Sequence, residues 1–197
     1  MKNSTGLGTK KTQLIMENFT SRRYFMRNSA IALTGLAVLT PALTSALTSE
    51  NPYAGYNPYA EETCDLRTGL FNSNTIAVKG TVYKKDGFTP LNNALVEVWH
   101  LSPNSTKYRH RGKFLTNDQG NYEFLTDYPN KEEGKNSRIY FKISDSGNTQ
   151  YTELILASTG GHISSKHWEN NKQLGEKLFP KQTQFLNKTT FQFNLSI

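Results

Sequence analysis

The stretch "NSRIYFKI" (Asn136–Ile143) has the alternating pattern of a β-strand with one buried face. Every second residue from Ile139 to Ile143 is apolar, and side chains two residues apart in a strand point to the same face. Arg138 and Tyr140 are therefore predicted to stand side by side on the opposite face. Two large polar side chains at such positions make this face the first candidate for a functional site.

Similar strand patterns recur from Thr75 to the C-terminus, separated by turn residues such as "KDG" and "NDQG". The predicted strands lie within Thr75–Lys84, Asn93–Trp99, Gly112–Thr116, Asn121–Thr126, Arg138–Ser144, Tyr151–Leu156 and Thr190–Ile197. Short strands spaced roughly 8–12 residues apart are typical of an antiparallel sandwich or barrel. We predict an all-β, antiparallel β-sandwich with few short helices, and only Lys166–Leu178 favours a helical turn or two.

Charge and cysteine content exclude several classes of function. Residues 1–46 carry six Lys or Arg and one Glu, so +5 of the formal net charge of +7 lies there. The remaining chain is nearly neutral, which gives no electrostatic basis for binding nucleic acid. Cys64 is the only cysteine, so an intramolecular disulfide and paired-cysteine metal or redox sites are excluded.

Residues 1–46 have the organisation of an export signal. Arg22, Arg23 and Arg27 precede a modest apolar run, and small residues lead up to a predicted cleavage site after Ala46. The sequence around the arginine pair, Ser-Arg-Arg-Tyr-Phe-Met, resembles a twin-arginine signal. The apolar run is too short for a spanning helix, so we expect a mature protein without a membrane span, located in the periplasm or outside the cell.

Residues 47–63 contain a repeated Asn-Pro-Tyr-Ala sequence, at Asn51–Ala54 and Asn57–Ala60. Two prolines and a glycine within ten residues predict an exposed linker. The sandwich domain is then expected to span residues 64–197.

Taken together, the residues between the strands of the body strongly resemble the core of the intradiol ring-cleavage dioxygenases, the catechol and protocatechuate dioxygenase family. The matching elements are Gly80-x-Val82, Asp86-Gly87, Pro90-Leu91, Ala94-x-Val96-Glu97-Val98-Trp99, Tyr108, Arg111-Gly112, Thr116-x-x-x-Gly120-x-Tyr122-x-Phe124 and Tyr128-Pro129. The resemblance covers about residues 64–157. It implies a β-sandwich of the intradiol dioxygenase type.

The resemblance also implies a mononuclear, non-haem Fe(III) site with two tyrosine and two histidine ligands. The tyrosines match Tyr108 and Tyr128, and Tyr128 would leave the metal to take up a substrate proton. The metal would activate a catechol-type substrate toward O₂, which is inserted between the two hydroxyl-bearing carbons to give a ring-opened diacid. Trp99, His110 and Lys135 are expected in the pocket, with Lys135 at the position of an arginine of the family.

Arg138 and Tyr140 stand where the family has its two histidines. Tyr140 is a candidate third phenolate ligand, because ferric iron accepts hard oxygen donors. The guanidinium of Arg138 has no lone pair to donate, so it is expected to pair with a phenolate or with a bound carboxylate.

Three hypotheses follow for function. The first is an exported Fe(III) dioxygenase with an altered ligand set. The second is a family member that has lost the iron and binds an aromatic or anionic small molecule. The third is a sandwich domain that serves as an interaction module.

Overall fold

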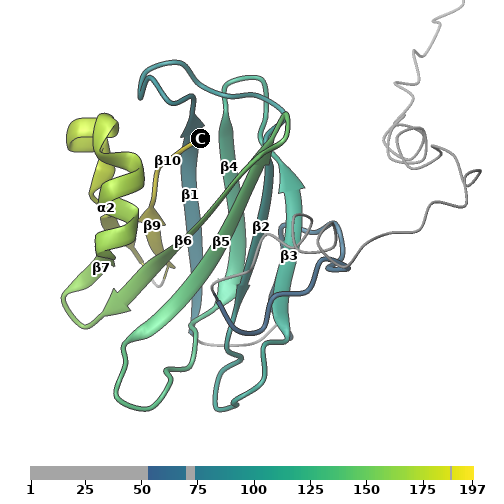
Figure 1. The fold of residues 1–197 in the computed structure, drawn as a ribbon. Coiled ribbons are helices and arrows are strands. Elements are labelled where there is room, and N and C mark those ends of the chain that lie inside the picture. The colour runs from purple at the N-terminus through teal and green to yellow at the C-terminus, as the bar shows by residue number, and fades with distance from the viewer. Residues whose placement is uncertain (1–52, 70–73, 187) are drawn as a thin grey trace, which may run out of the picture. The chain divides into compact units, whose positions relative to one another are not determined.

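The computed structural model describes residues 53–69, 74–186 and 188–197, and these form a β-sandwich with one short α-helix beside it (Figure 1). The predicted leader, residues 1–46, and the first part of the predicted linker lie outside the described residues. The strands are β1 (Thr75–Tyr83), β2 (Leu95–His100), β3 (His110–Leu115), β4 (Asn121–Asp127), β5 (Ser137–Asp145), β6 (Asn148–Ala157), β7 (Gly160–Ile163), β8 (Lys181–Phe185), β9 (Lys188–Gln192) and β10 (Leu195–Ser196). The helix α2 (Ser165–Asn171) continues into a 3-10 helix over Lys172–Leu178. In the described part of the chain, no helix has the length and apolar character needed to cross a membrane.

Two five-stranded sheets form the layers of the sandwich. One sheet has the order β3-β2-β5-β6-β7, and all of its pairs are antiparallel. In the other sheet β1 is central, with β4 antiparallel on one side and β9 and β10 parallel on the other, and β8 pairs antiparallel with β9. The prediction of an all-β sandwich is confirmed. The parallel pairing of β9 and β10 with β1 was not predicted.

The core lies between the sheets and is built from the alternation seen in the sequence. Ile139, Phe141 and Ile143 of β5 are fully buried, and the ring of Phe141 lies 5.2 Å from that of Phe193. The other core side chains include Val78, Val96, Val98, Phe124, Leu154 and Leu156. Because these residues fill the inner faces, the polar residues of β5 are left on the outer face of its sheet.

The C-terminal strand differs from the prediction because it is interrupted at Phe193 and Asn194. The side-chain oxygen of Asn194 accepts a hydrogen bond from the backbone N–H of Thr81, so a side chain replaces one backbone contact of β1. The stretch predicted as one strand is therefore divided between β9 and β10. The helical prediction for Lys166–Leu178 agrees with α2 and the 3-10 helix that follows it.

Residues 61–66 link the two sheets at their edges. The backbone N–H of Lys113 in β3 donates to the carbonyl of Glu61, and the N–H of Leu125 in β4 donates to that of Cys64. Thr63 lies so close to Gly112 that a Cβ at Gly112 would stand 2.5 Å from the Thr63 carbonyl oxygen. The predicted linker, residues 47–63, thus ends in a segment that is packed onto the sandwich.

Two buried histidines give the fold a predicted dependence on pH. Burial lowers the pKa of His100 to about 3 and that of His167 to about 4, so both are neutral in the folded chain at neutral pH. The unfolded chain binds protons at these residues near pH 6.5, and the free energy of unfolding is therefore expected to fall as pH drops from about 6.5 toward 4. Each histidine contributes a loss of roughly 1 kcal/mol per pH unit in this window.

Urea titrations between pH 7 and pH 4.5 measure this loss. His167→Gln removes one of the two groups and is expected to flatten the decline relative to the unsubstituted chain. His162 is exposed, so His162→Gln serves as the control and leaves the decline unchanged. Equal slopes for all three proteins would contradict the assignment to His167.

Candidate functional site

Aromatic side chains gather on the outer face of the β3-β2-β5-β6-β7 sheet. Trp99 of β2 and Tyr140 of β5 are directly opposite in the strand pairing, with ring centroids 5.8 Å apart. Tyr108 lies just before β3, with its ring centroid 6.3 Å from that of Tyr140. Tyr151 of β6 belongs to the same cluster. We call these four residues the aromatic face.

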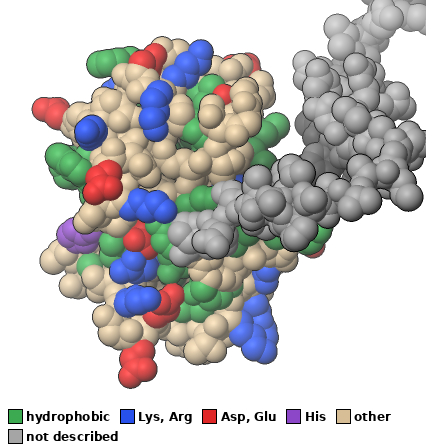
Figure 2. Space-filling view, in the orientation of Figure 1, with side chains coloured by type: hydrophobic (Ala, Val, Ile, Leu, Met, Phe, Trp, Pro, Cys, Tyr) green, Lys and Arg blue, Asp and Glu red, His purple; other side chains and the backbone are tan. Residues whose placement is uncertain are grey.

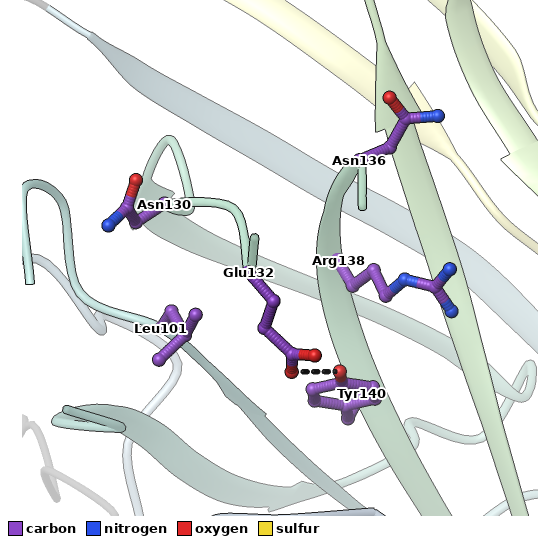
Figure 3. A pocket seen from close by; sticks show the side chains of 6 residues that line it. All are labelled: Leu101, Asn130, Glu132, Asn136, Arg138 and Tyr140. Atoms are coloured by element: carbon purple, nitrogen blue, oxygen red, sulfur yellow. Dashed lines mark hydrogen bonds between the residues drawn. The ribbon is translucent and has the colours of Figure 1, made fainter. Parts of the chain in front are cut away.

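Glu132 connects two phenols of the aromatic face. Its Oε1 accepts a hydrogen bond from the hydroxyl of Tyr108 at 2.8 Å. The same oxygen accepts a hydrogen bond from the hydroxyl of Tyr140 at 3.1 Å (Figure 3). Glu132 lies in the loop before β5, so chain folding brings its carboxylate over the strand that carries Tyr140. A cavity of about 10 Å³ between Glu132, Arg138 and Tyr140 has room for about one water molecule.

The two basic residues of the site are already paired with carboxylates. Arg138 Nη1 donates to Glu153 Oε2 on β6 at 2.6 Å, and its side chain points away from Glu132 (Figure 3). Lys135 Nζ lies 2.5 Å from Glu132 Oε2. Each of these two cations therefore has a carboxylate partner at the site, and Figure 2 shows acidic and basic side chains interspersed over one face of the molecule.

These contacts hold Glu132 ionised and the phenols neutral. Hydrogen bonds from Lys135 and Tyr108 lower the pKa of Glu132. Burial, together with the hydrogen bond to Glu132 and the charge of its carboxylate, raises the pKa of Tyr108 to about 12. Burial and the same carboxylate raise the pKa of Tyr140 well above its usual value. The site presents a carboxylate that accepts two phenolic hydrogen bonds at once.

The N-terminal segment covers part of the aromatic face. The ring of Tyr53 stacks on that of Tyr140, with centroids 4.8 Å apart and planes at 26°. The indole N–H of Trp99 donates to the carbonyl of Ala54 at 3.0 Å. The hydroxyl of Tyr56 donates to Glu97 Oε1 at 3.0 Å and accepts from Lys142 Nζ at 2.6 Å.

Two of the predicted site residues lie away from the aromatic face. Tyr128 packs partly against the inner core and lines a separate hollow with residues that include Asp127 and Asn130. The imidazole of His110 is buried, where its Nε2 lies 2.9 Å from Asp127 Oδ2 and its Nδ1 lies 2.9 Å from Ser102 Oγ. The structure therefore brings together Trp99, Tyr108, Lys135, Arg138 and Tyr140, and it does not bring Tyr128 or His110 to them.

Glu132, Glu153 and Tyr53 were not among the residues predicted for the site. Glu132 and Glu133 stand in a short polar loop between Pro129 and Arg138, and that proximity is the only signal for Glu132. Glu153 is directly opposite Tyr140 only through the register of β5 and β6. Tyr53 belongs to the Asn-Pro-Tyr-Ala repeat, whose tyrosines are unusual in an otherwise polar linker.

The fold and this site define the class of protein to which the chain is similar. No family model matches the sequence, and no curated protein matches it. Among solved structures, the fold matches the dioxygenase domain of a dioxygenase and carbohydrate-binding protein fusion from Streptomyces sp. SirexAA-E. The TM-score is 0.56 and the identity 17%, over 76% of this chain and 95% of that one.

Two further structures give the same result. An intradiol ring-cleavage dioxygenase from Tetranychus urticae matches with a TM-score of 0.56 and 16% identity, over 75% of this chain and 90% of that one. A chlorocatechol 1,2-dioxygenase from Pseudomonas putida matches with a TM-score of 0.52 and 20% identity, over 75% of this chain and 69% of that one. At these identities the likeness establishes that the chain has the intradiol dioxygenase fold.

The side chains at the site do not fit the Fe(III) centre that this fold implies. Arg138, a cation, stands at one of the expected ligand positions. The phenol hydroxyls of Tyr108 and Tyr140 both donate hydrogen bonds to Glu132. His110 lies in the interior, where it contacts Ser102 and Asp127. Across the described ranges, no three His, Cys, Asp or Glu side chains are grouped so as to hold a metal ion.

Proposed function

We propose that the chain is a member of the intradiol dioxygenase family that has lost the usual ferric site and binds a catechol-type aromatic molecule on the aromatic face. The observation that carries this proposal is the hydrogen bonding of Glu132, whose Oε1 accepts from the phenols of Tyr108 and Tyr140. An ionised carboxylate that already accepts two phenolic hydroxyls is suited to the two adjacent hydroxyls of a catechol.

The surrounding side chains suit the ring of such a ligand. Aromatic rings stack in offset or tilted arrangements with centroids about 4.5–7 Å apart, and Trp99 and Tyr140 already form such a pair. Arg138 and Lys135 are paired with the carboxylates of Glu153 and Glu132, so neither of them is free to bind a strongly anionic ligand. The balance of charge favours a neutral phenol over a carboxylic acid.

Ring cleavage at an iron centre is the alternative function. It has one observation in its favour, since the oxygen atoms of Tyr108, Tyr140 and Glu132 meet at one place and are hard donors. Such a protein would act on a catechol and O₂. The paired cations oppose this alternative, and so does the lack of a histidine among the described residues that contact the aromatic face.

Export remains part of the proposal. The arginine pair and the apolar run within residues 1–46 support transport out of the cytoplasm, so we place the binding function in the periplasm or outside the cell. The third hypothesis, an interaction module, has no comparable support from the site.

Catechol binding by the full chain tests the proposal. Titration calorimetry is expected to show that catechol binds to one site. The melting temperature is expected to rise with catechol concentration as this site fills. Glu132→Gln removes the charged acceptor and is expected to weaken binding roughly 10- to 100-fold, since hydrogen bonds to charged groups are worth about 1.5–3 kcal/mol. Glu133 is exposed, so Glu133→Gln serves as the matched control and leaves the affinity unchanged.

Iron content and visible absorbance of the same preparation decide the alternative. Under the proposal, protein reconstituted with ferric iron stays colourless and carries far less than one iron per chain. A visible tyrosinate charge-transfer band that disappears in Tyr108→Phe would establish the iron centre instead. Absence of catechol binding by the unsubstituted chain and by Glu133→Gln would refute the proposal.

A further inference from the structure

The segment Tyr53–Ala60, which we call the strap, lies over the part of the aromatic face where a ligand ring would stack. Its first residue places a phenol ring on Tyr140, 4.8 Å away between centroids. Lys166 of α2 also contacts this ring, with its Nζ 5.7 Å from the Tyr53 ring centroid. Tyr53 thus occupies a position with the geometry that a bound aromatic molecule would adopt.

The strap is held mainly by side-chain contacts. Within the described residues, its one backbone–backbone hydrogen bond is internal, from Ala60 N–H to the Asn57 carbonyl, whereas the next residues form backbone bonds with β3 and β4. The Ala54 carbonyl is tied to the domain through the indole of Trp99, and Tyr56 through Glu97 and Lys142. A segment without ladder bonds, joined at Glu61 to one that has them, has a natural pivot at that junction.

Gly55 allows the strap to approach the site closely. It has φ +81°, and a Cβ at this position would stand 2.1 Å from Cγ of the Tyr108 ring. Any larger residue would therefore both strain the backbone and displace the strap from Tyr108. The backbone of the strap, and not only Tyr53, is fitted to the aromatic face.

The two halves of the Asn-Pro-Tyr-Ala repeat have different environments. Tyr53 is packed on Tyr140, whereas Tyr59, the equivalent residue of the second copy, is 88% exposed. The sequence repeat therefore supplies one tyrosine that occupies the site and one that does not.

We propose that the strap is an internal ligand of the binding site, with the Tyr53 ring in the position that an incoming phenolic ring takes when the strap swings away. This inference rests on the proposed function, and it adds that binding is regulated by competition within the chain. A ligand gains access only from the fraction of molecules in which the strap is open, so the apparent affinity is reduced by that fraction.

Catechol titrations of strap variants test the competition. Tyr53→Ala removes the competing ring and is expected to tighten catechol binding about 2- to 10-fold, the range that corresponds to one aromatic pair. Gly55→Ala keeps Tyr53 but displaces the strap, and it is expected to tighten binding in the same direction. Tyr59→Ala changes only the exposed copy of the repeat, so this variant is expected to bind catechol as the unsubstituted chain does.

A readout without ligand follows the strap itself. Trp99 is 1% exposed and donates its indole N–H to Ala54, whereas Trp168, the other tryptophan, is 49% exposed. Hydrogen exchange of the Trp99 indole, followed by NMR, is expected to be slow in the full chain and at least several-fold faster in Tyr53→Ala. The Trp168 indole is the internal control and exchanges fast in both proteins.

The two readouts separate the possible outcomes. Catechol binding that is unchanged or weaker in both Tyr53→Ala and Gly55→Ala would overturn the competition and leave the proposed function standing. If the Trp99 indole exchanges at the same rate in the full chain and in Tyr53→Ala, the inference that Tyr53 holds the strap closed would be wrong. Faster exchange in Tyr53→Ala with no catechol binding by any variant would overturn the proposed function, although the strap closes as described.

Discussion

Replacing Phe141 by alanine is expected to lower the free energy of unfolding by about 3–5 kcal/mol. Phe141 is fully buried at the centre of the sandwich, and its ring contacts reach across to the opposite sheet, on β4 and between β9 and β10. Its centroid lies 6.1 Å from that of Phe124 on β4 and 5.2 Å from that of Phe193. Truncation leaves a cavity between sheets whose strands are fixed by backbone hydrogen bonds, so the site cannot collapse fully.

Equilibrium unfolding in urea measures the effect, and an exposed phenylalanine provides the control. Phe185 ends β8 and is 77% exposed, so Phe185→Ala is expected to change the free energy of unfolding by less than about 0.5 kcal/mol. Similar losses for the two variants would show that Phe141 is not part of a tightly packed core.

The second large effect is expected from Lys142→Met, which leaves a buried carboxylate without its cation. Lys142 Nζ lies 2.7 Å from Glu97 Oε2, and the Glu97 side chain is only 5% exposed. Burial disfavours the charged form of Lys142, but hydrogen bonds with Glu97 and Tyr56 outweigh burial and raise its pKa. Removing one partner of a buried ion pair typically costs about 3–5 kcal/mol, and we expect about 3 kcal/mol here, since Lys142 retains some exposure.

A double-mutant cycle assigns this loss to the pair. The double variant Glu97→Gln/Lys142→Met removes both charges. Its loss in free energy of unfolding is expected to be clearly smaller than the sum of the losses of the two single variants. The exposed pair Lys188–Glu123, 4.0 Å apart with both side chains 57% exposed, is the control, and Lys188→Met is expected to cost less than about 1 kcal/mol. Additive losses in the Lys142 and Glu97 cycle would contradict the ion-pair assignment.

Local sequence patterns were sufficient to predict the sandwich. The period of two in β1, β2, β4, β5 and β6 depends only on neighbouring residues, because it follows from the pleat of a single strand. The strand β8 was missed, since all five of its residues are exposed and its sequence, "KQTQF", carries no buried face. The break between β9 and β10 was also missed, because it depends on a contact between Asn194 and the distant residue Thr81.

The candidate site was predictable where it follows from strand alternation and, for Trp99, Tyr108 and Lys135, from the resemblance to a known family. Arg138 and Tyr140 were placed on the outer face of their strand, and the structure has them there. Tyr128 shows the limit of this reasoning, because it stands in a turn at the end of β4, where no alternation determines the direction of a side chain. In the structure it packs partly against the inner core.

The amino-acid sequence was enough to predict the class of fold and the strand on which the site lies, because both follow from alternation along single strands and from the motifs between them. The partners of that strand depend on tertiary structure. Strand register brings Glu153 to Arg138, loop placement brings Glu132 to two phenols, and the packing of the N-terminal segment brings Tyr53 onto Tyr140. Each of these contacts joins residues from separate elements, so it exists only once the sheets and the segments around them have packed together.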